Sequence, residues 1–246
     1  MTDPIRLVSA AQFTERPAMP HQLAAWNRLQ ERQTPEVMRE FAELFRAGPK
    51  PVKAPLVQPV TAGNGSIELP GFPFFSQLDN GPNGWRQCQT SSIAMCLRYL
   101  KVPGITDDLD YLRVVIRHGD TTSQAAHTAA LADLGVRARF SQNMSQAQLL
   151  GELKGGRPCA IGVLHHGPSS APSGGGHYVA VYGATSSSAP SGGWRVMDPY
   201  GELDVLGGGW AAQGGNSGKG QVYSFRGLNP RWLKPGPSDG WGWLFS

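Results

Sequence analysis

The apolar positions in the middle of the chain recur every three or four residues, which is the spacing of amphipathic helices. In the clearest case, four apolar residues share one helix face at positions i, i+3, i+4 and i+7: Ile93, Cys96, Leu97 and Leu100. The pattern predicts further helices over about residues 107–118 and 121–134, the second opening with a capping box between Thr121 and Gln124. A shorter helix is expected to begin at Ser145.

After Gly155 and Gly156 the pattern changes to short apolar runs separated by Gly, Ser and Pro, which is typical of strands and loops. The predicted strands have the sequences PCAIGVL, HYVAVYGA, WRVMDPY and QVYSF, and an earlier segment, GFPFF, is also strand-like. A helical half followed by a sheet half predicts an α+β domain, most simply with an antiparallel sheet. Its natural active site is the cleft between the two layers.

Two short helices are predicted near the N-terminus, one after Pro20 and one beginning at Thr34, and together they form a helical hairpin. So few residues rarely hold a core alone, so the hairpin should dock on the main domain or on a partner. A stretch rich in Pro and small residues follows and is typical of an extended linker. We therefore predict an accessory segment at 1–48, a linker at 49–68 and one main domain at 69–246.

The composition adds limits on partners and location. The net charge of +4 is a mild excess that favours an acidic polymer such as cell wall, but the sequence lacks the concentrated Lys and Arg stripe of a nucleic-acid binder. No stretch approaches the roughly 18 apolar residues of a membrane span, and no basic region precedes an apolar run at the N-terminus. We expect a protein made in the cytoplasm without a signal peptide, with no membrane span and no nucleic-acid partner. The oligomeric state is not given by the sequence.

The chain has three cysteines and no C-x-x-C pair, which argues against a disulfide framework and a zinc knuckle. Cys96 lies on the apolar stripe of its helix and Cys159 lies within an apolar strand, so both are predicted to be core residues. No metal or other cofactor is predicted. Asp79 begins a segment that hints at a calcium loop, but the closing glutamate is missing because position 90 is Thr90.

Cys88 stands where the loop NGPNGW turns into the first predicted helix of the main domain. A thiol is a useful nucleophile only as the thiolate, which a helix N-terminus and a neighbouring imidazolium stabilise. Cys88 meets the first of these conditions. From position alone, a nucleophile and a small buried residue are equally good interpretations.

Among the histidines, His177 is the predicted general base, because it starts a strongly strand-like segment directly after the flexible run Gly174–Gly176. His165 and His166 close the preceding predicted strand, and we expect them to line the substrate cleft rather than to act as the base. The other histidines fall in predicted helical segments and are expected to be solvated or packed: His21, His118 and His127.

An imidazole that acts as a base needs its other nitrogen held in place. Asp198 follows the predicted strand WRVM, and it could hold His177 if the two strands pair. An Asp before a Pro is also a common turn initiator, which is the alternative interpretation. The order Cys, His, Asp along the chain is that of papain and favours the catalytic role.

The oxyanion of a tetrahedral intermediate needs hydrogen-bond donors. The backbone N–H of Cys88 would be one, and the side-chain amide of Gln77 is our choice for the other. Gln87 is the second choice, because a residue adjacent to the thiol reaches this position awkwardly. Trp85 and Gln87, in the loop before Cys88, are also predicted to contact the substrate.

Six motifs in this order, FPFFSQLDN, CQTSSIAM, GDTT, GRPCAIGVLHHG, GGGHYVAVYGA and MDPYG, resemble the bacteriocin-processing (double-glycine leader) peptidase-like family over about residues 69–228. The resemblance implies a papain-like cysteine peptidase fold. It also implies catalytic roles for four residues: Cys88, His177, Asp198 and Gln77. The sequence departs from the family where Gln89 and Thr90 replace the usual small pair after the nucleophile, which leaves the shape of the oxyanion loop open.

The N-terminal segment PHQLAAWNRLQERQTPEVMREFAELFRAG looks like an accessory module of phage-encoded lytic enzymes. With the basic charge, it predicts hydrolysis of amide bonds in the peptide part of bacterial peptidoglycan, as by an endolysin that acts at the cell wall. Two alternatives stay open: a peptidase that processes a leader or a phage structural protein, and an inactive binding or virion component. Several aromatic residues near the C-terminus are expected to be core rather than a glycan platform: Trp232, Trp241, Trp243 and Phe245.

Overall fold

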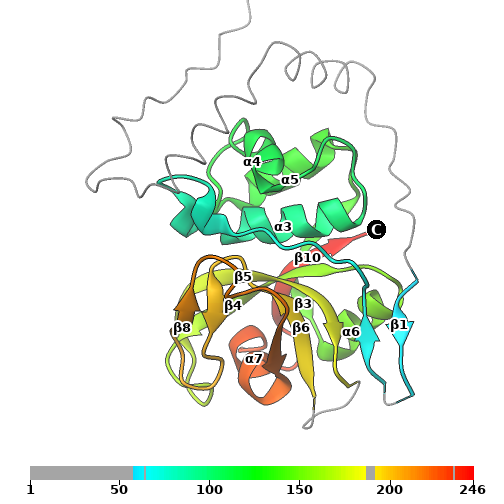
Figure 1. The fold of residues 1–246 in the computed structure, drawn as a ribbon, viewed down its shortest axis with the longest axis vertical. Helices are drawn as coiled ribbons and strands as arrows, with labels where there is room; N and C mark the ends of the chain where they lie inside the picture. Colours follow the sequence, from blue (N-terminus) through cyan, green and yellow to red (C-terminus); the bar gives the residue numbers. More distant parts are fainter. Residues whose placement is uncertain (1–57, 64, 187–191, 235) are drawn as a thin grey trace, which may run out of the picture.

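The computed structural model describes residues 58–63, 65–186, 192–234 and 236–246 (Figure 1). The predicted N-terminal helical hairpin and His21 lie outside these residues. None of the helices in the described ranges is long and apolar enough to cross a membrane.

Helices cover both faces of a central sheet (Figure 1). Three of them form a layer on one face: α3 (Cys88–Tyr99), α4 (Asp108–Val115) and α5 (Gln124–Asp133). Two others, α6 (Gln146–Lys154) and α7 (Phe225–Trp232), lie on the opposite face. Two short 3-10 turns, η2 (Gln77–Asp79) and η3 (Gly84–Arg86), precede α3.

The sheet has eight strands in the order β1-β2-β5-β4-β10-β3, with β6 paired to β5 and β9 to β6. Its members are β1 (Val60–Thr61), β2 (Ile67–Glu68), β3 (Ala138–Met144), β4 (Cys159–His166), β5 (Ser173–Ala184), β6 (Gly193–Met197), β9 (Gln221–Ser224) and β10 (Gly240–Phe245). A separate hairpin consists of β7 (Gly201–Leu203) and β8 (Trp210–Gln213). All the strand pairs are antiparallel, so the predicted α+β class with a helical layer on an antiparallel sheet is confirmed.

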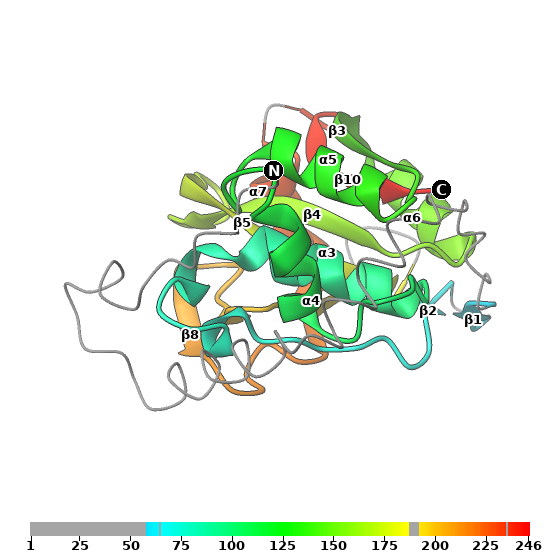
Figure 2. The same ribbon diagram turned by 90° about the horizontal axis from the view of Figure 1, so that it is seen from above.

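α3 is the central helix, because it packs on β4 and β5 of the sheet and α4 packs on its outer side (Figures 1 and 2). Nearly all of its side chains are buried, including the polar Thr90, Ser91 and Ser92. The first residue of this enclosed helix, Cys88, is only half-buried. The fold therefore presents the start of α3 at the boundary between the two layers.

The helix starts agree with the sequence in one case and differ in another. Ser145 caps α6 as predicted, since its hydroxyl accepts a hydrogen bond from the Gln148 backbone N–H at 3.2 Å. The predicted capping box at Thr121 is wrong: α5 begins later, and the Ser123 hydroxyl caps it by accepting from the Ala126 N–H. The Thr121 hydroxyl instead donates to a backbone carbonyl in η3.

Some strands differ from the sequence-based expectation. The GFPFF segment, residues 71–75, is not a strand, because prolines at 70 and 73 interrupt the backbone donors that a sheet needs. β3 and β10 were not predicted, although β10 lies between β4 and β3 in the sheet. Part of the segment expected to be a linker forms the β1–β2 hairpin, and Ile67 of β2 is buried against β5.

The C-terminal aromatic residues are largely core. Trp232 and Trp243 are fully buried, Phe245 is nearly so, and Trp241 is half-buried. A side chain at Gly162 on β4 would collide with the Trp241 ring, so the ring lies directly on the strand. These residues therefore hold α7 and β10 to the sheet.

Candidate active site

The structure brings together the three side chains that sequence reasoning selected. Cys88 is the first residue of α3, His177 lies in β5, and Asp198 follows β6. The antiparallel pairing of β5 with β6 sets Ala180 opposite Met197, which carries Asp198 to the side of His177. His177 Nε2 lies 2.8 Å from Asp198 Oδ1, and both side chains are buried.

The Asp198 carboxylate is held on both of its oxygens. Oδ1 accepts hydrogen bonds from His177 and from the Tyr200 backbone N–H at 3.1 Å, so Asp198 also initiates a turn. Oδ2 accepts from the Tyr223 hydroxyl at 2.9 Å. Tyr223 was missed by sequence reasoning, because a tyrosine in the apolar strand QVYSF looks like an ordinary core residue. Its hydroxyl fixes the carboxylate that orients His177.

The charge environment of His177 favours the imidazolium. Burial alone would lower its pKa, but the Asp198 carboxylate and the Cys88 thiol outweigh burial and raise the pKa of His177 to about 10. Because Nε2 faces Asp198, Nδ1 is the ring nitrogen left to meet the thiol. The site can therefore hold a positive imidazole between a carboxylate and a sulfur atom.

An aromatic wall stands beside His177. The Trp210 ring of β8 meets the His177 ring edge-on, with centroids 4.8 Å apart, and the Tyr200 ring lies 4.4 Å from Trp210. Neither residue was chosen from the sequence, since no motif marks a tryptophan in a glycine-rich loop. The rings cover the imidazole on this side.

His165 and His166 lie next to this wall. The His165 ring is 5.7 Å from Trp210 and 6.3 Å from His177, between centroids, and the His166 ring is 4.0 Å from His165. Burial, followed by the neighbouring histidines, lowers the pKa of His165. A Cβ at Gly174 would collide with the His166 ring, so the glycine run lets β5 pass close to this pair. Their role in substrate binding stays a prediction.

Gln77, the predicted oxyanion donor, is fully buried in η2. Its backbone N–H donates to the Pro199 carbonyl at 2.9 Å, which ties η2 to the turn after Asp198. Its side-chain nitrogen donates to the Gly84 carbonyl at 2.7 Å, and its Oε1 has no partner among the described residues. One amide hydrogen is left over, so the role of Gln77 as an oxyanion donor also stays a prediction.

The loop residues before the thiol differ in exposure. Gln87 is buried and precedes α3 directly. Trp85 is 63% exposed, and the Arg86 guanidinium lies over its ring at 5.7 Å from the centroid. A large exposed ring beside the helix start can contact a substrate, which remains the predicted role of Trp85.

Gln89 and Thr90, at which the sequence departs from the family pattern, lie in the first turn of α3. The side-chain nitrogen of Gln89 donates to Gln124 Oε1 at 2.5 Å, and Gln124 donates to the Tyr178 hydroxyl at 3.0 Å. Thr90 is fully buried. Gln89 therefore links α3 to α5 and, through Gln124, to β5.

The remaining cysteines and His127 are packed in the core, whereas His118 lies on the surface. Burial raises the thiol pKa of both Cys96 and Cys159, as expected for core positions. Burial lowers the pKa of His127 to about 4, and its ring is held by the Tyr111 hydroxyl at 3.0 Å. His118 bonds Asp133 on the surface.

A half-buried cysteine at the start of a central helix, facing a histidine on an antiparallel sheet, is the arrangement of papain-like cysteine peptidases. Residues 70–207 match the model of the Peptidase_C39 like family, more than half of the chain, and the chain belongs to this family. The predicted resemblance is thereby confirmed, and membership supports a cysteine peptidase as the general class of protein.

A solved structure from Bacillus anthracis, classed as a C39-like peptidase, is similar, with a TM-score of 0.49 and 14% sequence identity. The likeness covers 74% of this chain and 97% of that one. None of the curated proteins matches this sequence.

Proposed function

We propose that this protein hydrolyses amide bonds with Cys88 as nucleophile, His177 as general base and acid, and Asp198 as the group that orients the histidine. The observation that carries the proposal is the position of His177, whose ring lies between the Asp198 carboxylate, 2.8 Å from Nε2, and the thiol at the start of α3. No other described histidine has a carboxylate on one side and a cysteine on the other.

The proposed reaction is acyl transfer in two steps. The Cys88 thiolate attacks the carbonyl carbon of the substrate, and the new oxyanion accepts hydrogen bonds from the Cys88 backbone N–H and the Gln77 amide. The Cys88 N–H is available because the first N–H groups of a helix have no partner within it. His177 then gives its proton to the leaving amine, which departs and leaves an acyl-enzyme. Water, deprotonated by His177, hydrolyses the thioester and releases the acid.

The electrostatics of the site support this mechanism. A pKa of about 10 keeps His177 protonated at neutral pH, so a thiolate beside it gains a fixed counter-charge. Asp198 carries hydrogen bonds on both oxygens and so holds the ring in one orientation. The ring of Trp210 excludes water from one side of the imidazole, which strengthens each of these interactions.

We propose the peptide part of bacterial peptidoglycan as the substrate. Support comes from the net charge of +4, which suits an acidic wall polymer, and from the likeness of the N-terminal segment to modules of lytic enzymes. Action at the cell wall, as by an endolysin, follows from this substrate.

Purified peptidoglycan and an unfolded polypeptide, each incubated separately with the full chain, distinguish the possibilities. Mass spectrometry of newly released amino groups should find products from peptidoglycan, and Cys88→Ala should release none. Cleavage of the polypeptide alone would replace this substrate with a processing role. No cleavage of either one would favour a binding or virion component, and full activity of Cys88→Ala would refute the mechanism.

A further inference from the structure

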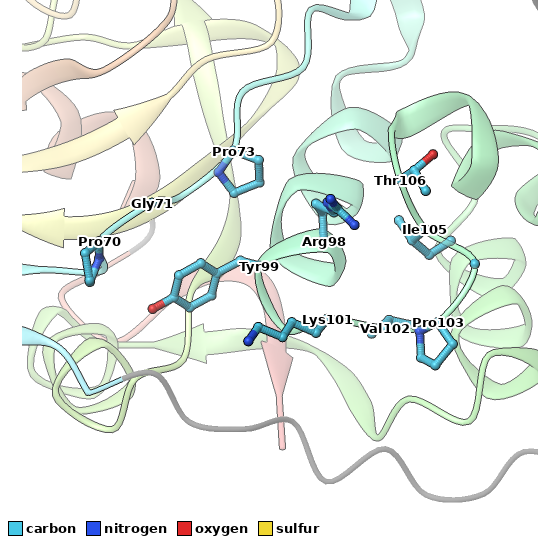
Figure 3. A pocket seen from close by; sticks show the side chains of 11 residues that line it. Pro70, Gly71, Pro73, Arg98, Tyr99, Lys101, Val102, Pro103, Ile105 and Thr106 are labelled. Carbon is cyan, nitrogen blue, oxygen red and sulfur yellow. The ribbon is translucent and has the colours of Figure 1, made fainter.

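A second concave site lies at the other end of α3 from Cys88. It is a pocket of about 690 Å³ between the segment before η2 and the loop after α3, shown in Figure 3. α3 has 12 residues, so a rise of about 1.5 Å per residue puts the pocket roughly 17 Å from the thiol. The volume falls in the range of small-molecule sites. This pocket is therefore separate from the candidate active site.

The lining combines two cations with an apolar wall. Arg98 and Lys101 supply the positive charges, and none of the lining residues is acidic. Neither cation forms an ion pair within the part of the chain that the structure describes. The wall consists mainly of apolar side chains: Pro70, Pro73, Val102, Pro103 and Ile105. Such a surface suits a ligand that has both apolar groups and negative charge.

Lys101 occupies a backbone position that favours glycine. Its φ of 56° is the only positive value of a non-glycine residue in the described ranges. The Lys101 N–H bonds the Arg98 carbonyl and the Val102 N–H bonds the Leu97 carbonyl, which is a Schellman motif with Lys101 at the left-handed position. A cation at the C-terminus of a helix offsets the helix dipole, but this explains a positive charge nearby and not a strained lysine. The retention of a lysine at this position favours a role for its side chain in the pocket.

Tyr99 brings an unused hydrogen-bond donor to the same pocket. The residue is only 6% exposed, and its hydroxyl has no partner among the described residues. Its ring is fixed against Phe72, with centroids 5.3 Å apart. Burial raises the pKa of the hydroxyl, so it stays protonated and can donate. A buried polar group without a partner costs stability unless a ligand satisfies it.

We propose that this pocket binds an acidic peptide segment, with carboxylates at Arg98 and Lys101 and apolar side chains against the prolines. Figure 3 shows the Arg98 side chain directed toward Thr106 and the Lys101 side chain directed toward Tyr99. Positive charges that point to different parts of a site suit single carboxylates spaced along a peptide better than one compact phosphate. The ligand is held by charge, by the Tyr99 hydroxyl and by apolar contact. The inference does not depend on the catalytic proposal.

The test uses the full chain carrying Cys88→Ala, so that cleavage cannot obscure binding. The probe is an acetylated and amidated hexapeptide that alternates Glu with Leu and Pro, and its counterpart carries Gln in place of Glu. Titration calorimetry at low salt should show that the Glu peptide binds at least about tenfold more tightly than the Gln peptide. The double variant Arg98→Gln, Lys101→Gln should lose this preference. The matched control Arg137→Gln, Arg139→Gln removes two exposed cations, one directly before the edge strand β3 and one within it, and should keep the preference.

Two single variants distinguish a loss of binding contacts from a loss of folding. Lys101→Gly relieves the left-handed strain and Tyr99→Phe removes an unpartnered hydroxyl, so both should unfold at the same or a higher temperature while binding the Glu peptide several-fold more weakly. Equal binding of the two peptides, or an equal loss in the control variant, would overturn the proposal. Inorganic phosphate that binds as tightly as the Glu peptide would overturn it in favour of a small-anion site.

Discussion

At the scale of single residues, the histidine at the centre of the site depends on groups that sequence patterns do not mark. Cys88, His177 and Asp198 could be selected because a helix start, a strand start and a strand end leave recognisable signals. Tyr223, which holds the second oxygen of Asp198, could not be selected, because only the pairing of β6 with β9 brings it there. Trp210 was missed for a similar reason, since only its contact with the His177 ring in the folded protein marks it as part of the site.

Tyr223→Phe should lower kcat/KM by about tenfold while leaving KM nearly unchanged, because the Asp198 carboxylate loses one of the bonds that orient it. Steady-state kinetics on the cleaved substrate measure this effect. Tyr182→Phe is the matched control, since the Tyr182 hydroxyl makes no hydrogen bond within the described residues and the change should leave the kinetics unchanged. Equal kinetics for the two variants would show that Tyr223 has no positioning role.

The raised pKa of His177 also links its charge to stability. A group whose pKa is higher in the folded protein stabilises the fold fully below its ordinary pKa of about 6.5, and that contribution is lost as the pH rises toward about 10. In Asp198→Asn the carboxylate is gone and burial dominates, so the pKa of His177 should fall below its ordinary value. Urea unfolding should therefore show an excess stability of the wild type over Asp198→Asn that is large at about pH 6 and shrinks toward about pH 10. A difference that does not change with pH would contradict the charge pairing.

At the scale of elements, the central helix and the turns before it decide where the thiol lies. The helix was predicted from its apolar spacing, and β4 to β6 from their apolar runs. β10 was missed because its sequence, GWGWLF, has glycines at two alternate positions and no polar residues. It therefore lacks the alternation of apolar and polar residues that marks a strand. Its buried position between β4 and β3 is a consequence of tertiary packing alone.

Gly84 lies where η3 contacts η2, which carries Gln77, the predicted oxyanion donor. A Cβ at this position would lie 2.2 Å from the Gln77 carbonyl oxygen, so Gly84→Ala must separate η2 from η3 and displace the Gln77 amide. We expect kcat to fall by at least about tenfold. Gly151→Ala, on the open surface of α6, is the control and should keep activity and slightly raise stability. Unchanged activity of Gly84→Ala would show that catalysis does not depend on the position of η2.

Arg231 in α7 joins the end of β4 to the loop after β7. It is fully buried, and its guanidinium donates to the carbonyls of Val205 at 2.8 Å, Leu164 at 3.0 Å and Gly167 at 2.6 Å. Arg231→Met removes the donor to these carbonyls and should reduce the free energy of unfolding by about 3 kcal/mol, measured by urea unfolding. Arg226→Met, exposed on the same helix, should change it by less than about 0.5 kcal/mol. A similarly small change in the free energy of unfolding for both variants would show that the hydrogen bonds of Arg231 do not stabilise the fold.

At the scale of the whole molecule, the two layers meet where the chemistry is proposed. The Gln77 backbone bonds the Pro199 carbonyl across this boundary, so the turn after Asp198 and the loop before α3 are held together. The class of fold followed from the order of helical and strand patterns, whereas the convergence of the site depends on strand register, which the sequence does not specify. The family model ends at residue 207, yet β9, α7 and β10 complete the sheet and its second helical face. The domain limits at residues 48 and 68 stay a prediction.

The proposed mechanism requires that His177 activates the sulfur of Cys88. The decisive measurement is the rate at which iodoacetamide alkylates Cys88 as a function of pH, followed by peptide mass spectrometry in the wild type and in His177→Ala. We predict rapid alkylation of Cys88 in the wild type near about pH 6, slow alkylation in His177→Ala until the pH exceeds about 8, and protection of the buried Cys96 and Cys159 in both. The same pH dependence of the Cys88 rate in both proteins would contradict the account.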